Sequence, residues 1–329
     1  LGHTSNLGLR ALMECTGINK DAISPYHIGF VLGPCINASG RLDTAKRALA
    51  LLNAKEKKEA DVLAGDLKAL NDSRKDMTAR ALEEALIQVE TTEIREDDVL
   101  VIYLPDCHES LAGIVAGKVR EEYYKPVFVL TRAAEGLKGS GRSIETWHMY
   151  EGIHRCAHLL TKYGGHKMAA GLSLPEENLD AFRRLINEKS GITEDDLTEK
   201  ISIDMQLPFS CATETFIREL RVLEPFGKGN TKPLFAERNV MVHSARILGK
   251  NRNVLKLRVE DQSHKQVDAM YFGNIPDFQT YIAGKYGRDA MEQLFRGKGS
   301  DIFMAFTYYP DINEYHGIKN TQIIIQNYK

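Results

Sequence analysis

The sequence predicts an α/β domain joined to an all-β domain, with a helical part in front of both. Three observations lead to this fold class. Strand and helix patterns alternate between residues 99 and 186, residues 55–89 form one long proline-free helical pattern, and short strand patterns follow from residue 201 onward. A chain of 329 residues is long enough for two domains and an additional helical segment.

Composition limits the functional classes. The chain has 43 Lys and Arg against 45 Asp and Glu, so its net charge neither favours nor excludes nucleic acid and the charge distribution must decide. The five scattered cysteines contain no Cys-x-x-Cys pair, which favours reduced thiols in a cytoplasmic protein over a zinc knuckle. We find no apolar run of the ~20 residues that span a bilayer and no signal peptide, so we expect a soluble protein. The first residue is Leu1 rather than Met, so we expect an upstream segment.

The N-terminal part predicts short helices followed by a long one. A helix is expected over Leu7 to Cys15, and residues 33–41 form a stretch of small residues that ends in Arg41. Asp43 is expected to cap the next helix, which places Arg41 at a loop-to-helix junction, where it either holds an anion beside free N–H groups or is simply solvated. The pattern over Lys55 to Val89 predicts a connector helix of ~50 Å between two lobes.

The middle of the chain predicts an open α/β sheet. Strands are expected over residues 99–104, 126–130, 138–144 and 170–174, with helices after residue 108, after residue 149 and over residues 179–186. Ligands of such sheets gather at the strand ends. His108 stands at one strand-to-helix junction, where it is either an N-cap or a polar group that faces the site.

Two glycine-rich segments in this domain predict a phosphate site. The first surrounds Ser140, Gly141 and Arg142, and the second is Gly164-Gly165-His166. Glycine lets backbone approach a ligand closely, and the guanidinium of Arg142 matches phosphate oxygens with a planar fork of donors. Each segment alone could be an ordinary turn or helix end, but their occurrence in one short α/β region favours a site between Arg142 and His166.

After a linker at residues 190–200, the chain predicts a small closed barrel such as an OB-fold. Strands are expected over residues 201–207, 234–248, 254–259, 266–272, 301–309 and 321–328, with one helical insertion near residues 276–295. Residues 223–230 are interpreted as the turn into the barrel rather than as a phosphate loop. The aromatic residues Phe303, Phe306, Tyr308, Tyr309 and Tyr315 belong either to the core or to a stacking platform.

A basic stripe is predicted on the barrel, since residues 239–259 contain five basic residues and no acidic one. Strand alternation puts Lys256 and Arg258 on one face and the leucines between them on the other. A basic strand beside aromatic strands is what a single-strand groove requires. The candidate nucleic-acid-binding residues are Arg246, Lys250, Arg252, Lys256 and Arg258.

These motifs together resemble the RecJ family of single-strand-specific 5′-to-3′ exonucleases, members of the DHH phosphoesterase superfamily. The four matching segments are Gly33 to Arg41, His108 to Ala116, Lys138 to Ile144 and Gly164 to Gly171; residues 223–235, 311–315 and 321–325 are similar as well. The resemblance implies a tail of the DHH lobe at 1–54, a connector helix at 55–95, a DHH-associated α/β domain at 96–190 and an OB-fold at 200–329.

The resemblance also implies roles for the site residues. His166 and Arg142 are the expected catalytic residues, and the expected 5′-phosphate pocket consists of Arg41, Ser140, Gly141, Arg142, Gly164 and Gly165. Cys35 departs from an arginine that is common in the family, which affects part of that pocket. The family's Mn²⁺ or Mg²⁺ ligands lie in motifs that this chain does not match, so they are expected upstream of residue 1, and the fragment alone is expected to bind DNA without cleaving it.

The expected partners follow from the same resemblance. They are single-stranded DNA, a single-strand binding protein and a RecQ-type helicase, for a monomer without membrane contact that acts in DNA repair and recombination. One alternative is a small-molecule DHH phosphodiesterase for cyclic dinucleotides or very short RNA, which would share Gly-Gly-His but need no barrel. A stand-alone binding module is a second alternative. Residues 201–329 discriminate the first two possibilities.

Overall fold

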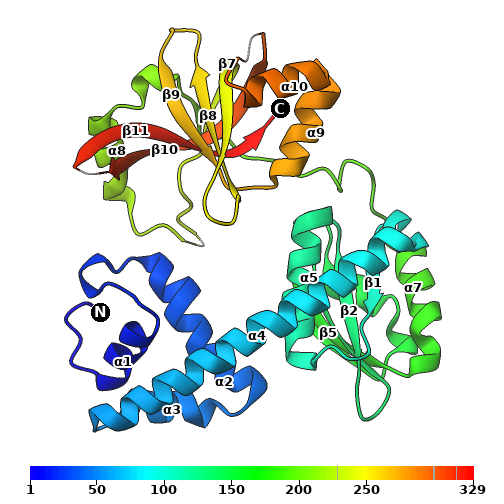
Figure 1. Ribbon diagram of the computed structural model, residues 1–329. Helices are drawn as coiled ribbons and strands as arrows, with labels where there is room; N and C mark the ends of the chain where they lie inside the picture. The colour runs from blue at the N-terminus through cyan, green and yellow to red at the C-terminus, as the bar shows by residue number, and fades with distance from the viewer. Residues whose placement is uncertain (228, 299–300, 316) are drawn as a thin grey trace. The chain divides into compact units, whose positions relative to one another are not determined.

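The computed structural model describes residues 1–227, 229–298, 301–315 and 317–329, and it divides into two compact units, Leu1–Glu199 and Lys200–Lys329 (Figure 1). Lys228, which belongs to the predicted turn at residues 223–230, lies outside the described residues. Each unit has its own hydrophobic core. Within the described ranges, no helix combines the length and apolar character required to cross a membrane.

Three short helices pack against the first half of a long one in the N-terminal part. They are α1 (Leu7–Cys15), α2 (Gly33–Leu42) and α3 (Ala45–Asn53), and they share a core with α4 (Lys57–Thr91). The small-residue stretch at residues 33–41 was expected to be a loop, and it is helix α2 instead. Its small residues Ala38 and Ser39 are fully buried, because they let the helix pack closely against its neighbours. Thr44 caps α3 by accepting from the backbone N–H of Lys46 (3.3 Å), so the expectation for Asp43 was wrong.

Helix α4 has 35 residues and is therefore about 52 Å long at 1.5 Å per residue. Its first half contributes Ala60, Ala64 and Leu67 to the N-terminal core, and its second half contributes Ala81 and Ala85 to the α/β core. The same helix thus belongs to two cores, as the connector prediction requires. The helix ends at Thr91, and the side chain of the next residue, Thr92, caps a short 3₁₀ turn.

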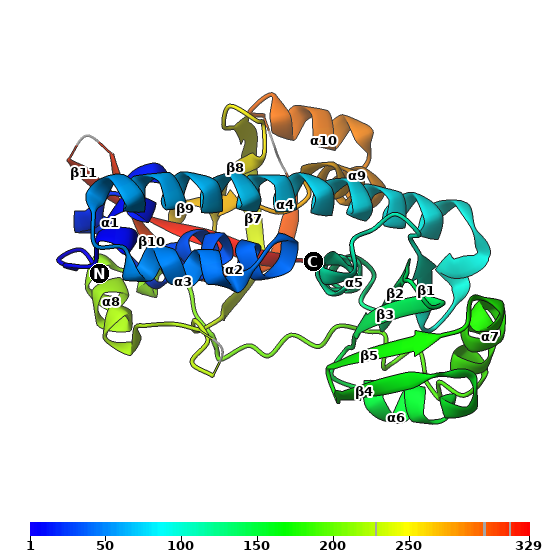
Figure 2. The ribbon, with the colours of Figure 1, turned by 90° about the horizontal axis from the view of Figure 1, so that it is seen from below.

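The α/β part has a five-stranded sheet in the order β1-β2-β3-β5-β4. The strands are β1 (Leu100–Tyr103), β2 (Val127–Arg132), β3 (Leu137–Arg142), β4 (Lys162–His166) and β5 (Ala169–Leu174). Only the β1–β2 pair is parallel. Helix α5 (Glu109–Tyr123) shares a core with one face, and α6 (Met149–His154) and α7 (Leu179–Glu188) share a core with the other (Figure 2).

The Gly-Gly-His segment is a strand, whereas the sequence suggested a loop. Gly164 and Gly165 lie in β4, opposite Gly171 and Ala170 of β5. A Cβ atom on Gly165 would lie 2.4 Å from the carbonyl oxygen of Ala169, so this position of the β4–β5 hairpin has no space for a side chain. Glycine lowers strand propensity, which is why the pattern alone indicated a turn.

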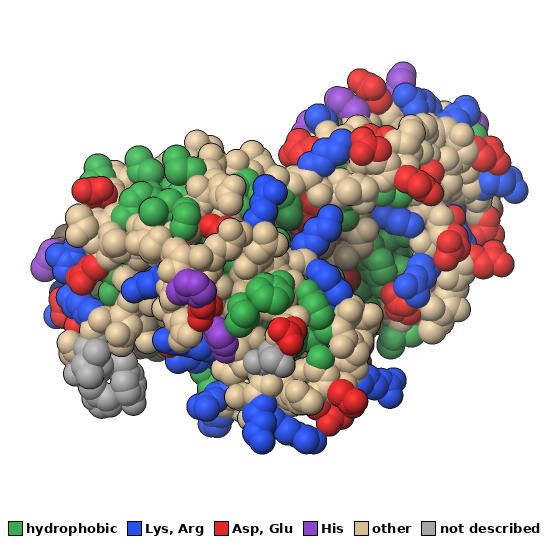
Figure 3. All heavy atoms as spheres, turned by 90° about the horizontal axis from the view of Figure 1, so that it is seen from above, with side chains coloured by type: hydrophobic (Ala, Val, Ile, Leu, Met, Phe, Trp, Pro, Cys, Tyr) green, Lys and Arg blue, Asp and Glu red, His purple; other side chains and the backbone are tan. Residues whose placement is uncertain are grey.

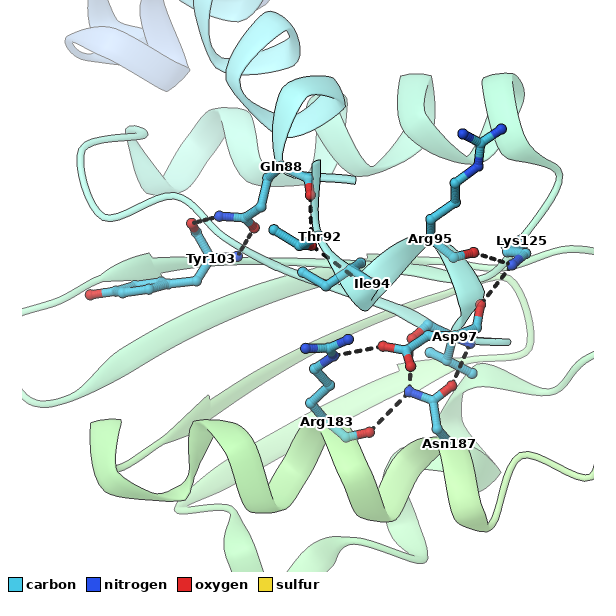
Figure 4. Close-up of polar contacts among 10 residues, drawn as sticks. Gln88, Thr92, Ile94, Arg95, Asp97, Tyr103, Lys125, Arg183 and Asn187 are labelled. Atoms are coloured by element: carbon cyan, nitrogen blue, oxygen red, sulfur yellow. Dashed lines mark hydrogen bonds and ion pairs between the residues drawn. The ribbon is translucent and has the colours of Figure 1, made fainter. Parts of the chain in front are cut away.

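Two side-chain amides cover the free edge of β1 (Figure 4). Gln88 of α4 donates to the carbonyl oxygen of Tyr103 (3.2 Å) and accepts from its N–H (3.1 Å), and Asn187 of α7 makes the same pair of bonds with Val99 (3.1 and 2.8 Å). Nearby, Arg183 pairs with Asp97 at 2.6 Å. The two amides satisfy edge groups that would otherwise be open to another strand, and they attach α4 and α7 to the sheet.

The second unit is a closed barrel. Its strands are β7 (Phe235–Leu248), β8 (Val254–Glu260), β9 (Gln266–Tyr271), β10 (Phe303–Tyr315) and β11 (Ile318–Tyr328), and β10 pairs with both β11 and β7. Numbered from β7, the strand order is 1-2-3-5-4-1, with the third and fifth strands parallel. This is the five-stranded Greek-key arrangement of an OB-fold and confirms the predicted fold class.

The connections of the barrel differ from the prediction in detail. The helical insertion is two helices, α9 (Ile275–Tyr286) and α10 (Arg288–Phe295). The first predicted strand shrinks to β6 (Met205–Gln206), and α8 (Glu214–Leu220) was not predicted. Phe306, Tyr308 and Tyr309 are buried in the barrel core, while Phe303 is exposed. These three aromatics therefore serve packing rather than stacking with bases.

Candidate phosphate and nucleic-acid site

Arg142 and His166, the two principal candidates, belong to one row of directly paired residues that runs across strands β3, β5 and β4. Arg142 of β3 lies directly opposite Ala169 of β5, and Ala169 lies directly opposite His166 of β4. Side chains of directly paired residues point to the same face of a sheet, and neighbouring strands lie ~4.8 Å apart. The side chains of Arg142 and His166 therefore rise from the same face, two strand spacings or roughly 10 Å apart at the backbone.

The same alternation makes this face polar. Ser140 lies in the row of Gly171 and Gly164, and Lys138 lies in the row of Ser173 and Lys162. Helix α5 packs against β2 and β3 on this side. A cavity of about 410 Å³ lies beside its first turn and is lined by Glu109, Ser110, Ala112, Lys138, Gly139, Ser140, Lys162, Tyr163, Gly171, Leu172 and Ser173.

Arg142 is held in a fixed position by its own strand and by a glycine of α5. Its Nη1 donates to the carbonyl oxygen of Gly141 (2.7 Å) and to Oγ of Ser140 (3.3 Å). A Cβ atom on Gly113 would lie 2.7 Å from both Nη2 of Arg142 and Oγ of Ser140. The absence of a side chain at Gly113 thus gives the guanidinium its space against the first turn of α5.

Arg41 reaches the same helix turn from the N-terminal part. It lies in the last turn of α2, not at a helix start as expected, and its Nη1 donates to the carbonyl oxygen of Ser110 (2.7 Å). Burial lowers the pKa of Arg142, and the charges of Arg41 and Arg120 lower it further. Among the residues that the structure describes, neither Arg41 nor Arg142 forms a salt bridge with a carboxylate. Two unneutralised guanidinium groups at one helix turn are suited to an anion.

His166 is exposed near the tip of the β4–β5 hairpin, and its Nδ1 accepts from the backbone N–H of Met168 (3.2 Å). A neutral ring in this arrangement carries its proton on Nε2, which is then a donor toward a ligand. The hairpin tip is itself held in place, since Ser143 and Met149 donate to the carbonyl oxygens of Met168 (2.9 Å) and Lys167 (3.0 Å).

Two other candidates, His108 and Cys35, have structural roles. His108 is the N-cap of α5, where its Nδ1 accepts from the N–H of Ser110 (3.3 Å) and lies 2.7 Å from Oγ of the same residue. Cys35 is only 1% exposed and belongs to the N-terminal core, where burial raises the pKa of its thiol. Cys35 therefore packs against apolar neighbours rather than facing a ligand.

On the barrel, β8 alternates as predicted: Leu255, Leu257 and Val259 are buried, and Lys256 and Arg258 face outward. The stripe is not purely basic, because Asp268 of β9 pairs with both Lys256 (2.8 Å) and Arg258 (3.1 Å). Burial alone would raise the pKa of Asp268, but hydrogen bonds from these two cations outweigh it and hold the pKa below its usual value. Sequence spacing could not reveal this neighbour, since it comes from the next strand.

The remaining basic candidates lie around the β7–β8 hairpin. Arg246 is directly opposite Lys256, and Lys250 and Arg252 lie in the connecting loop. All three are exposed and, within the described parts of the chain, form no salt bridge. Phe272, just after β9, is 59% exposed and was missed as a candidate stacking residue; period-two alternation from Met270 would have placed it on the outer face.

Charge is mixed over the face of the molecule that Figure 3 shows. In Figure 3, Lys and Arg side chains alternate with Asp and Glu over the face in view, in line with the balanced composition. Local groups of cations therefore matter more than net charge. Among the described residues, no three His, Cys, Asp or Glu side chains are grouped so that they could hold a metal ion, and no chemical step is assigned to a metal in this chain.

Comparison with known families finds the same two domains in the same order. Residues 96–190 match the DHHA1 domain, and residues 203–327 match the RecJ OB domain. The chain is 32% identical to RecJ of Escherichia coli and 31% identical to RecJ of Haemophilus influenzae, both named single-stranded-DNA-specific exonucleases, over 97% of this chain and 54% of each relative. The chain belongs to the RecJ family.

Solved structures agree with this assignment. A crystal structure of RecJ in complex with Mn²⁺ from Thermus thermophilus is similar with a TM-score of 0.80 at 27% identity, over 99% of this chain and 44% of the other. The corresponding structure with Mg²⁺ has a TM-score of 0.79 at 26% identity. The chain spans about half the length of these relatives.

Proposed function

We propose that this chain is the DNA-holding portion of a single-stranded-DNA-specific 5′-to-3′ exonuclease of DNA repair and recombination. The observation that carries the proposal is the common face of Arg142 and His166, with Arg41 at the adjacent turn of α5. Arg142, Arg41 and Ser140 bind the 5′-terminal phosphate, with backbone of Gly141, Gly164 and Gly165 close by. His166 donates from Nε2 to a phosphate oxygen, and His108 supports the turn that they share.

The barrel supports single-stranded DNA as the ligand. OB-folds bind oligonucleotides on the face of their second and third strands and on the adjoining loops. In this chain that face is β8–β9, with Lys256, Arg258 and the β7–β8 loop. The alternative ligand, a cyclic dinucleotide or very short RNA, would not require this domain.

The proposal is tested by measuring the affinity of the 329-residue chain for 3′-labelled oligonucleotides at two salt concentrations. We expect tighter binding to a single strand than to a blunt duplex, and tighter binding to a 5′-phosphorylated single strand than to its 5′-hydroxyl form. Equal affinity for the single strand and the duplex would contradict a single-strand groove. Equal affinity for the two 5′ ends would contradict the phosphate site.

We propose further that the whole enzyme uses Mn²⁺ or Mg²⁺, with ligands outside these residues. In two-metal phosphoester hydrolysis the ions activate water and stabilise charge on the phosphate. The isolated chain should therefore bind DNA and release no nucleotides in Mn²⁺ or Mg²⁺. Metal-dependent release of mononucleotides by the purified chain would contradict this expectation. A single-strand binding protein and a RecQ-type helicase are the proposed partners of the whole enzyme, which is proposed to be a cytoplasmic monomer.

Substitution of Lys256 by alanine tests the barrel face. If Lys256 contacts a phosphate, Lys256→Ala should weaken binding to all single strands to a similar extent and reduce the slope of log affinity against log salt by about one. Asp268→Asn should have the opposite effect and strengthen binding, because it removes the carboxylate that neutralises Lys256 and Arg258. The control is Lys285→Ala, an exposed lysine of α9 outside the β8–β9 face. An unchanged slope for Lys256→Ala would place Lys256 outside the groove.

A further inference from the structure

The buried face of α4 is apolar toward both ends of the helix but polar in the middle. Along this stripe, Ala64 and Leu67 belong to the N-terminal core, and Ala81 and Ala85 to the α/β core. Between them the stripe continues with Asn71 and Thr78, which are 3% and 5% exposed, and with Arg74, which is half-buried. Polar residues at these positions give up packing, so their place between two cores points to a ligand rather than to stability.

Arg74 is held in position by its own helix. Its Nε and Nη2 donate to Oδ1 of Asn71 at 3.2 and 3.0 Å, and its carbonyl oxygen accepts from Oγ1 of Thr78 at 2.7 Å. Within the described residues, Nη1 has no hydrogen-bond partner and the guanidinium has no salt bridge. A fixed guanidinium with one free edge loses little side-chain entropy when it binds an oxyanion.

Arg74 is close to the phosphate site described above, because α4 packs against both α2, which carries Arg41, and α5, whose Ser110 accepts a hydrogen bond from Arg41. Partial burial lowers the pKa of Arg74, and the charge of Arg41 lowers it further; Arg41 acts in the same sense on Arg142. Arg41 is thus the common neighbour of two guanidinium groups, one on α4 and one on β3. No carboxylate of the described residues forms a salt bridge with any of these three arginines.

We propose that Arg74 binds the first internucleotide phosphate of a strand whose 5′-terminal phosphate is held by Arg142 and Arg41. The site then recognises two successive phosphates and distinguishes a 5′-phosphorylated oligonucleotide from a mononucleotide. The inference rests on the proposed function, because it assumes that Arg142 and Arg41 hold the terminal phosphate. It adds a residue of the connector helix and a second phosphate position to that site.

The test is a double-mutant cycle, in which the effect of neutralising one phosphate of the DNA on affinity is compared between the unaltered chain and an Arg74 variant. The two single strands are a 3′-labelled, 5′-phosphorylated oligothymidine and the same strand with a neutral methylphosphonate at the first internucleotide linkage, both measured in EDTA. For the unaltered chain we expect the neutral linkage to lower affinity about fivefold, which is the upper range for a partly exposed charge pair. For Arg74→Gln we expect the same linkage to change affinity less than twofold, because the partner is already absent.

Two variants separate this role from a structural one. Arg80→Gln removes the same charge from an exposed position of α4 and should keep the fivefold effect. Arg74→Lys keeps a charge and should retain part of it, and the thermal midpoint of each variant shows whether it is folded. A fivefold effect of the neutral linkage in Arg74→Gln would overturn the inference. If Arg142→Ala nevertheless lost the 5′-phosphate preference, the proposed function would stand and only the role of Arg74 would be wrong. If the unaltered chain showed no 5′-phosphate preference, the proposed function itself would be wrong.

Discussion

Replacement of Arg142 by alanine is expected to remove the preference of this chain for a 5′-phosphorylated single strand. The guanidinium is fixed by Gly141 and Ser140, lies against the first turn of α5 and has no carboxylate partner among the described residues. A charge-assisted hydrogen bond contributes roughly 1.5–3 kcal/mol, so affinity for the phosphorylated end should fall at least about tenfold. Affinity for a 5′-hydroxyl strand should change little, because that strand is held by the barrel.

Measurement of both strands against the same variants makes this expectation specific. Arg142→Lys should recover only part of the preference, since a lysine offers a point charge without the planar fork. Arg184→Ala, an exposed arginine of α7 on the other side of the sheet, is the matched control and should leave both affinities unchanged. If Arg142→Ala weakened both strands equally, the side chain would support the fold rather than read the 5′ end.

The sequence selected Arg142 and His166 as candidates without predicting the local structure that places them on one face of the sheet. Arg142 and His166 were selected from their glycine-rich surroundings, yet the Gly-Gly-His segment is strand β4 rather than a loop. Glycine occurs where two backbone segments approach each other closely. Such an approach occurs in a hairpin whose paired residues are small as well as in a turn. Pairing register, which puts Arg142 and His166 on one face, depends on contacts between strands that local pattern does not contain.

Long, regular elements were predictable because their pattern lies within one stretch of sequence and does not depend on contacts between strands. The connector helix and the barrel strands have periodic apolar positions over many residues, and their identity was correct although several ends moved. Arg74 was overlooked because one arginine in a helical pattern has the appearance of a solvated residue. Only the buried neighbours Asn71 and Thr78 show that it lies on the packed side of α4.

The two neighbouring glycines of β4 are expected to respond differently to the same added methyl group: Gly165→Ala should lose stability, and Gly164→Ala should lose ligand preference. In Gly165→Ala the Cβ would lie 2.4 Å from the carbonyl oxygen of Ala169 and 2.6 Å from Cα of Ala170, and the residue has a φ of +157°. Backbone of the paired strand would have to move, so we expect a loss of roughly 2–3 kcal/mol in the free energy of unfolding. Urea unfolding of the two variants and the unaltered chain measures this difference.

Gly164→Ala has no heavy atom within 4 Å of its new Cβ, so its stability should stay within about 0.5 kcal/mol of the unaltered chain. Its methyl group would nevertheless project from the face that carries Arg142 and His166, in the row of Gly171 and Ser140. It should therefore reduce the preference for a 5′-phosphorylated strand in a stable protein, since a ligand could no longer approach the backbone. Full preference in Gly164→Ala would mean that the ligand does not pass over β4, and the phosphate would then have to bind between β3 and α5 without His166.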